Sequence, residues 1–256
     1  MDRISNLSDD LLLKILSQLP TKIVVETMFL SIRWKFLWTM VRKLDFDDGF
    51  DYNYDGRYFD DGFKRFRQYV DRFMVLHKSP RLETLKFNLG TLSSTDDMET
   101  WIRIAIVRQV RELEINRFHL DDDKSFILPL CLYTFENLVV LKLYKTIILD
   151  VPWDLEVTLS SLKTLHLLSL QYIDEESHRN LLAGCPVLKE LVVDKTEHWS
   201  FKSFSVIMPS LERFSIIDVY TEEEYRTVGI PFFSNDSFVI NVPSLKYLNY
   251  VEIPMT

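Results

Sequence analysis

The sequence has little glycine and almost no cysteine. Its 256 residues include six glycines and two cysteines. Two cysteines are too few for a disulfide framework in a chain of this length. We therefore expect Cys131 and Cys185 to be reduced and mostly buried, and the protein to be intracellular, in the nucleus or the cytosol. The glycines are scattered, and no Gly-x-x-x-x-Gly-Lys phosphate loop occurs.

Long apolar runs are also missing, and the charge is unevenly distributed. No run approaches the roughly 20 apolar residues that span a bilayer. Asp2, Asp9 and Asp10 interrupt any signal-peptide core at the N-terminus. Residues 1–44 carry seven Lys/Arg against four Asp/Glu, a charge of +3, so the net charge of -8 leaves -11 for the rest. Binding to a phosphate backbone requires a basic stripe, so we expect no nucleic-acid partner. Because no long apolar run occurs, we also expect no membrane partner.

Groups that could carry catalysis do not gather in the sequence. The five histidines lie in different segments, and none is part of a recognisable nucleophile motif. A zinc-binding ligase domain needs about eight Cys/His ligands in close pairs, which this chain cannot supply. We therefore expect no enzyme activity, no metal site and no cofactor.

The N-terminal segment has the pattern of short amphipathic helices. The first predicted helix begins at Asp9, with Ser8 as its N-cap, and ends before Pro20. Leu7 and Leu12 have the spacing of a hydrophobic staple. One broad apolar face is formed by Leu11, Leu12, Ile15, Leu16 and Leu19.

Two further helices are predicted, over residues 22–30 and from a cap at Ser31. In the third, Trp34, Leu37, Trp38 and Val41 share one face. Three short helices in 44 residues cannot bury all these side chains among themselves. The surplus either serves a partner or packs onto the rest of the chain, and the residues alone leave both readings open.

This segment closely resembles the plant F-box. The resemblance lies in residues 2–12, 15–22 and 30–38, and it extends through 44–48. It implies docking onto a Skp-family adaptor and, through the adaptor, onto a cullin scaffold. Ser8 stands where the family usually has proline, and Ile32 where it usually has lysine. The implied adaptor-binding residues are Leu7, Ser8, Leu11, Leu12, Ile15, Leu16, Leu19, Pro20, Val24, Leu30, Trp34 and Trp38.

An acidic, aromatic stretch follows from Asp45 to Asp61, with seven aspartates. Within it, Asp51-x-Asn53-x-Asp55-Gly56 resembles the opening of a calcium loop. The twelfth position is Gly62, however, where that loop needs a bidentate glutamate. We therefore predict a solvated linker that does not bind calcium. A connecting helix is predicted from Phe63 to about His77, because apolar residues recur there on one side.

The rest of the chain is a repeat. The fragment Leu-x-x-Leu-x-Leu, with close substitutions, begins at residues 82, 110, 138, 162, 188, 211 and 245. Seven copies near a common period predict a solenoid, and unrelated strands of an ordinary α/β domain are the alternative. Positions 3 and 5 residues after each start fall on one side of a strand, so each fragment is predicted to be a strand of a parallel sheet. The return paths include a helical stretch at 177–184 and an irregular one at 152–158.

In this frame, positions 2, 4 and 6 residues after each start point away from the core, onto a concave face. Solenoids use such faces for recognition, and a target that binds elsewhere is the alternative. The predicted target-binding residues are Lys86, Glu114, Lys142, Tyr144, His166, Glu190 and Asp194.

The repeats resemble those of plant F-box proteins with irregular leucine-rich repeats, on Leu181-Leu-Ala-Gly-Cys-Pro186 followed by Leu188. Regular repeats place an asparagine after the strand, and here it is absent, which predicts a less regular curve. Members of this group often carry a further C-terminal FBD domain, and this sequence stops at Thr256. We therefore expect a short or truncated member with an unprotected final strand.

Together these patterns predict an α/β protein. A three-helix F-box (1–48) leads through an acidic linker and connecting helix (49–80) into about seven irregular leucine-rich repeats with a parallel sheet (81–256). The resemblance implies a non-catalytic substrate receptor of a Skp–cullin–F-box ubiquitin ligase with an unknown target protein. A binding scaffold without ubiquitin transfer is the alternative, and a small-molecule sensor is a third reading.

Overall fold

The fold was obtained as a computed structural model, which describes residues 4–48, 59–90, 94–117, 126–145, 147–195, 203–221 and 237–255. The chain forms two compact units, residues 1–118 and 119–256. The first unit contains the predicted F-box, the connecting helix and the first two repeats. The predicted domain boundaries at residues 48 and 80 stay predictions. No helix in the described part of the chain is long and apolar enough to cross a membrane.

The first unit begins with short helices, as predicted, but the third begins at Trp34 with Arg33 as its N-cap and not from a cap at Ser31. In chain order they are η1 (Ile4–Asn6), α1 (Asp9–Leu16), α2 (Thr21–Glu26), η2 (Thr27–Phe29), α3 (Trp34–Leu37) and η3 (Trp38–Met40). Ser8 is the N-cap of α1, but its side chain makes no capping hydrogen bond. Helix α1 ends at Leu16, earlier than predicted, where the Ser17 hydroxyl donates to the Lys14 carbonyl at 2.8 Å. Such a bond to the preceding turn competes with helix continuation.

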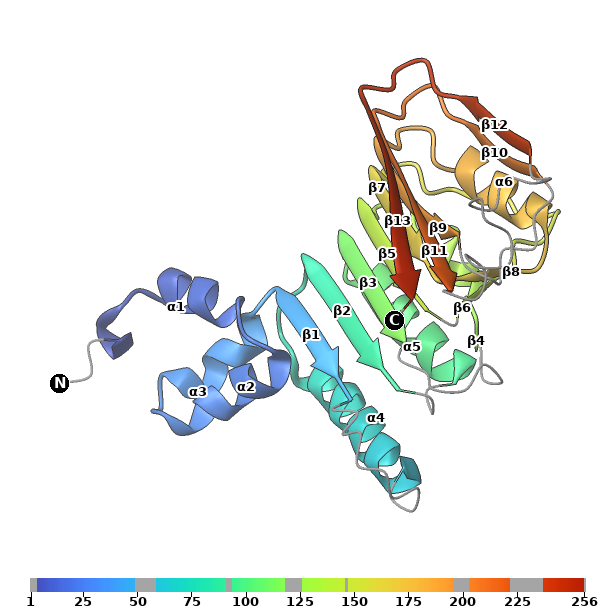
Figure 1. Ribbon diagram of the computed structural model, residues 1–256. Coiled ribbons are helices and arrows are strands. Elements are labelled where there is room, and N and C mark those ends of the chain that lie inside the picture. Colours follow the sequence, from blue (N-terminus) through green and yellow to red (C-terminus); the bar gives the residue numbers. More distant parts are fainter. Residues whose placement is uncertain are drawn as a thin grey trace. The chain divides into compact units, whose positions relative to one another are not determined.

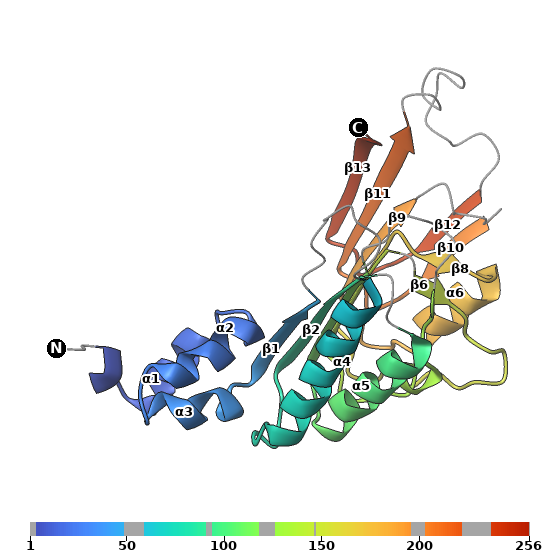
Figure 2. The same cartoon turned by 90° about the horizontal axis from the view of Figure 1, so that it is seen from below.

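Three parallel strands follow in this unit: β1 (Lys43–Asp47), β2 (Thr84–Leu89) and β3 (Glu112–Arg117). Helices α4 (Phe59–Leu76) and α5 (Thr95–Val107) cover one face of these strands (Figure 2). A capping box starts α5, because the Asp97 backbone N–H donates to the Ser94 hydroxyl while the Asp97 carboxylate accepts from the Ser94 backbone. Strand β1 was not predicted as a repeat strand, although Val41, Leu44 and Phe46 have the repeat spacing.

The second unit contains the other predicted strands, side by side in chain order (Figure 1). They are β5 (Val140–Tyr144), β7 (Thr164–Leu168), β9 (Glu190–Lys195), β11 (Arg213–Thr221) and β13 (Tyr247–Met255), each parallel to the next. All seven predicted strands are therefore confirmed, in the parallel arrangement that a repeat requires. Unrelated strands of an ordinary α/β domain would not pair in register one repeat after another.

The return paths of the second unit carry smaller elements. Strands β4 (Phe126–Ile127), β6 (Ile147–Leu149) and β8 (Gln171–Tyr172) form one sheet, and β10 (Ser203–Ile207) pairs with β12 (Ser237–Asn241). A short helix, η5 (Leu130–Leu132), precedes β5. Helix α6 (Glu175–Ala183) confirms the predicted helical return, and residues 152–158 contain no helix or strand, also as predicted.

Each strand buries the side that its spacing predicts. In the first six repeats the leucine-type residues 3 and 5 positions after the start are buried. In the last repeat the equivalent Leu248 and Tyr250 are 57% and 40% exposed. Strand β13 pairs with β11, and it is the last strand of this sheet among the described residues. The expectation of an unprotected final strand stays a prediction.

Carboxylates from neighbouring strands support two turns that regular repeats would support with asparagine. The Asp194 carboxylate accepts from the Ser169 backbone N–H at 2.5 Å and from its hydroxyl at 2.9 Å. Ser169 has a positive φ of 57°. Asp48 likewise accepts a hydrogen bond from the Gly90 backbone. The turns thus keep a polar partner for their N–H groups, although the asparagine is missing.

Candidate functional site

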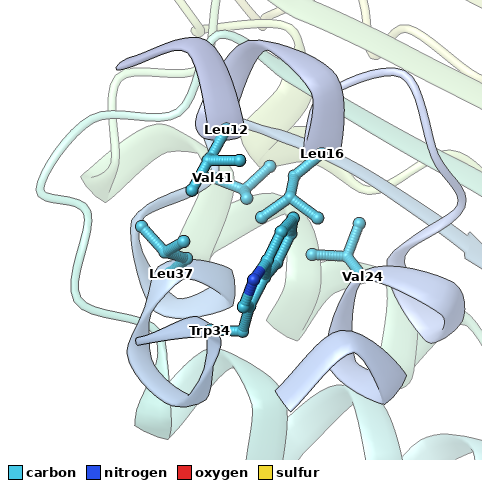
Figure 3. Packing of buried hydrophobic residues seen from close by; sticks show 6 residues of the cluster. All are labelled: Leu12, Leu16, Val24, Trp34, Leu37 and Val41. Atoms are coloured by element: carbon cyan, nitrogen blue, oxygen red, sulfur yellow. The ribbon is translucent and has the colours of Figure 1, made fainter. Parts of the chain in front are cut away.

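Six residues form the core of the F-box helices (Figure 3). They are between 0% and 4% exposed: Leu12, Leu16, Val24, Trp34, Leu37 and Val41. Leu7, Leu19 and Trp38 are partly buried against this cluster. Of the twelve predicted adaptor-binding residues, Leu12, Leu16, Val24 and Trp34 therefore lie inside the module. A partner cannot touch them without rearrangement, so their contribution to adaptor binding would be to hold the helices in place.

The outer surface of the same helices is rich in exposed apolar side chains. Leu11 and Ile15, one turn apart on α1, are 50% and 45% exposed. Ser8, Pro20 and Leu30 of the predicted set are also exposed. The exposed apolar residues that the sequence-based set missed are Ile4, Ile23, Phe29, Ile32, Phe36 and Met40. So many exposed apolar groups on one small module indicate an interaction surface.

An ion pair holds the start of α1 against the turn before α3. The Arg33 guanidinium contacts Asp9 at 2.6 Å and donates to the Leu7 carbonyl at 2.5 Å. It thereby joins two segments that are 24 to 26 residues apart in the chain. This contact fixes the turn of α1 that presents Leu11.

The F-box helices are joined to the repeats by a polar junction around His77, at the end of α4. The His77 Nε2–H donates to the Val41 carbonyl at 2.7 Å, and its Nδ1 accepts from Arg108 Nη1 at 2.9 Å. Burial, opposed by the bond to Val41 and reinforced by the Arg108 charge, lowers the pKa of His77 to about 4. A neutral histidine therefore links the F-box, α4 and the end of α5.

Arg108 also closes the C-terminal end of α4. Its guanidinium donates to the Met74 carbonyl at 2.8 Å and to the Ser79 carbonyl at 3.1 Å. Next to it, the Lys78 and Ser79 backbone N–H groups donate to the Thr39 carbonyl at 2.8 and 3.1 Å. The carbonyls of Met74, Ser79 and Thr39 thus each accept a hydrogen bond where the modules meet.

An aromatic series crosses the same junction. The ring centroids of Trp38 in the F-box and Phe73 in α4 are 5.2 Å apart, and those of Phe73 and Phe46 of β1 are 5.3 Å apart. Phe46 stacks on Phe87 of β2 at 5.6 Å, and Phe87 stacks on Trp101 of α5 at 5.1 Å. The F-box and the first repeats therefore share one aromatic core.

The face of the strands opposite this core, here called the open face, consists of the residues 2, 4 and 6 positions after each repeat start, together with Lys43, Asp45 and Asp47 of β1. In the first unit, Lys86 pairs with Glu114 at 3.0 Å and faces Asp45 across the strands. Burial tends to lower the pKa of Lys86, but the bond to Glu114 and the nearby carboxylates raise it above its ordinary value. For Asp45, an acid, burial has the opposite effect and raises the pKa above its ordinary value. The structure thus brings the predicted residues Lys86 and Glu114 together, with Asp45, which was not predicted.

In the second unit the open face carries a connected set of charges. Glu190 contacts Arg213 at 2.8 Å and His166 at 3.4 Å. The bond from Arg213, and then that from His166, hold the pKa of Glu190 below its ordinary value. Lys142 faces His166 across β5 and β7, two residues before Tyr144. Four predicted target-binding residues therefore share this face. Arg213, which the strand spacing places on the same face but which is not in the predicted target-binding set, belongs with them.

Asp194 differs from the other predicted target-binding residues. It is buried, both of its carboxylate oxygens accept hydrogen bonds from Ser169, and burial raises its pKa. Its side chain supports a turn and is not presented to solvent. A strand pattern alone could not distinguish this role, because Ser169 lies 25 residues away in the sequence.

No set of three or more metal-ligating side chains comes together in the part of the chain that the structure describes. Residues 51–58 of the calcium-like motif lie outside the described residues. The prediction that this motif does not bind calcium therefore stays a prediction.

Comparison with known proteins agrees with this geometry. Residues 4–46 match the F-box domain, and residues 98–233 match the leucine-rich repeats of FBD-associated F-box protein At5g56370. The putative FBD-associated F-box protein At3g50710 of Arabidopsis thaliana is 50% identical over 257 residues, covering 98% of this chain and 56% of the relative. The F-box/FBD/LRR-repeat protein At4g26340 of the same plant is 42% identical over 252 residues, covering 98% and 55%. The chain thus spans a little over half the length of these curated relatives.

Proposed function

We propose that this chain, which belongs to the plant family of FBD-associated F-box proteins with leucine-rich repeats, is the substrate receptor of a Skp–cullin–F-box ubiquitin ligase. Its F-box would bind a Skp-family adaptor and through it a cullin scaffold. Its repeats would hold the target protein. The receptor itself would be non-catalytic and would act inside the cell, in the nucleus or the cytosol.

The observation that carries the adaptor half is the separation of core from surface in the F-box helices. Leu12, Leu16 and Trp34 stabilise the module from inside, while Leu11 and Ile15 leave about half of their surface in water. Exposing such side chains costs free energy that a partner recovers by covering them. The departure at Ile32 adds a further exposed apolar group to this surface.

Contacts within the first unit support the adaptor half. The shared aromatic core and the His77–Arg108 bonds join the F-box helices to α4 and the first repeats. Helices that are already ordered in this way lose less entropy when a partner binds them.

The open face of the second unit supports the target-binding half. It presents cations, a carboxylate and the aromatic ring of Tyr144 on parallel strands, a mixture suited to a polar protein surface. Arg and Tyr are also the residue types most often found as binding hot spots.

The test combines target capture with ubiquitin transfer. Affinity capture with a proteasome inhibitor present would identify proteins held by the wild-type chain. The variant with Lys142, Tyr144, His166 and Glu190 replaced by alanine should capture the adaptor normally but lose these targets. A reconstituted adaptor–cullin complex should then ubiquitinate a captured target only with the wild-type chain.

Two results would count against the proposal in different ways. Adaptor and target capture without any ubiquitin transfer would indicate a binding scaffold. Unchanged capture of every target by the four-residue variant would reject the open face as the target site and leave the adaptor half intact.

A further inference from the structure

A groove in the first unit lies between the F-box helices and α4, away from the open face. It has a volume of about 460 Å³, and its lining includes Val25 and Met28 of α2 and η2, Trp38, and Phe73 and Leu76 of α4. This volume falls within the roughly 300–1,000 Å³ of sites that hold small ligands, so it has room for a few apolar side chains. Most of the residues that line it are apolar.

Helix α4 forms one wall of the groove with a continuous helical face. The groove-lining residues of α4 are Arg65, Gln68, Tyr69, Arg72, Phe73 and Leu76. Their spacing of three and four residues places them one above another. The adjoining face of α4 buries Phe66, Val70 and Met74. The wall is therefore an organised surface of the helix.

Two arginines of this wall, Arg65 and Arg72, are exposed. Neither forms an ion pair with any residue that the structure describes. By contrast, Arg67, on the same helix but outside the groove, contacts Asp97 at 2.9 Å. The groove thus has an apolar floor and two exposed arginines along α4.

Tyr69, which also lines the groove, is partly desolvated. Burial, and after it the nearby Glu26 carboxylate, raise the pKa of Tyr69 to about 12. Glu26 itself is not among the residues that line the groove.

We propose that this groove docks an acidic amphipathic peptide segment of a partner protein. Its apolar side chains would fill the floor between Met28 and Phe73, and its carboxylates would lie against Arg65 and Arg72. Two arginines beside an apolar floor are too few cations for a nucleic-acid backbone, which calls for a longer basic stripe. The two arginines of the groove lie on α4, outside the F-box match at residues 4–46, so they can be changed without substituting any residue of the F-box helices.

The experiment selects peptides from a random twelve-residue display library on the full chain. We expect the enriched sequences to combine apolar residues with two or more Asp/Glu. The double variant R65E/R72E should weaken the binding of a selected peptide about 10-fold or more, because two attractions become repulsions. M28D should weaken the same peptide comparably by placing a charge in the floor.

The matched control is R81E/R111E. It makes the same charge change at two exposed arginines of the same unit that do not line the groove. We expect its peptide affinity to stay within about twofold of wild type, since remote surface charges are largely screened. Circular dichroism would confirm that all variants are folded.

Three outcomes would overturn the proposal. The first is a library that yields no enriched acidic sequence, and the second is a selected peptide whose affinity is the same for wild type and R65E/R72E. The third is concentration-dependent self-association that the double variant abolishes, which would make a second copy of this chain the occupant. Adaptor affinity, measured in parallel, should be the same for R65E/R72E and R81E/R111E.

Discussion

Replacing Arg108 with methionine tests whether the polar junction couples the F-box to the repeats. The guanidinium makes three hydrogen bonds, to His77 Nδ1, the Met74 carbonyl and the Ser79 carbonyl, at 2.9, 2.8 and 3.1 Å. Methionine keeps the length of the side chain but donates to none of them. The substitution therefore removes the polar link while filling similar space.

The expected loss of stability follows from these partners. A hydrogen bond from a charged donor is worth roughly 1.5–3 kcal/mol, and a buried acceptor left unpaired costs about 1–3 kcal/mol. Arg108 is only partly buried, so water can replace some of its bonds. We therefore expect the free energy of unfolding to fall by about 2–4 kcal/mol, below the sum of three full bonds.

The assay is urea unfolding of the wild type, R108M and the control R111M. Arg111 is exposed and forms no ion pair with any described residue, so R111M should stay within about 0.5 kcal/mol of wild type. Hydrogen exchange of R108M should be faster at the end of α4, since local opening follows the loss of its cap. An R108M variant as stable as R111M would refute the reasoning.

The pH dependence of R108M offers an independent check. In the wild type the pKa of His77 is lowered from an ordinary value of 6.5 to about 4. Its stabilising contribution is therefore complete above the ordinary value and is lost as the pH falls from there toward 4. Removing the Arg108 charge should raise the pKa of His77 in the folded protein, and so narrow the pH range over which this contribution to stability is lost. An unchanged pH range in R108M would show that Arg108 does not act on His77.

Two further predictions concern the second unit. Gly184→Ala would bring a Cβ to 2.3 Å from Val157 Cγ1 and 2.6 Å from the Val157 carbonyl oxygen. The free energy of unfolding, measured in urea, should therefore fall by about 1–3 kcal/mol. A variant as stable as the wild type would show that the segment around Val157 moves to make room for the methyl group. Burial, reinforced by the Arg179 charge, lowers the pKa of His178 to about 3, so stability should decline as the pH falls below 6.5 toward 3. His178→Phe keeps an aromatic ring against Tyr172. It should reduce the change of unfolding free energy with pH by up to about 1.4 kcal/mol per pH unit in this range. An unaltered pH dependence would show that the pKa of His178 is not lowered in the folded protein.

The repeat strands could be predicted because their spacing is local and strict. In the first six repeats, positions 3 and 5 after the start face the core, as Leu85, Leu113 and Leu165 do. The same rule could have found β1, since Val41, Leu44 and Phe46 fit the fragment. It was missed because these residues also lie within the F-box resemblance, which supplied a different explanation for them. Helix α5 was missed too, although Ser94 and Asp97 carry the signature of a capping box.

The candidate surfaces could be predicted only in part. Helical periodicity groups Leu11 with Leu12, but it does not say which of them faces the core. That depends on where Trp34 and Val24 pack, which is tertiary information. The turn-supporting role of Asp194 depends on contact with a serine in another repeat. The groove at α4 depends on the approach of α2 to α4, which no local pattern records.

The central claim is that the exposed apolar face of the F-box binds a Skp-family adaptor. The measurement is the dissociation constant between a purified adaptor and the full chain, for wild type, L11A/I15A and the control V75A/V107A. Val75 and Val107 are strongly exposed apolar residues outside the F-box match, so the control removes similar surface elsewhere. We predict that L11A/I15A weakens binding by about 30-fold or more, as loss of interface anchors does, while the control binds as wild type. A folded L11A/I15A variant with wild-type affinity would contradict the account.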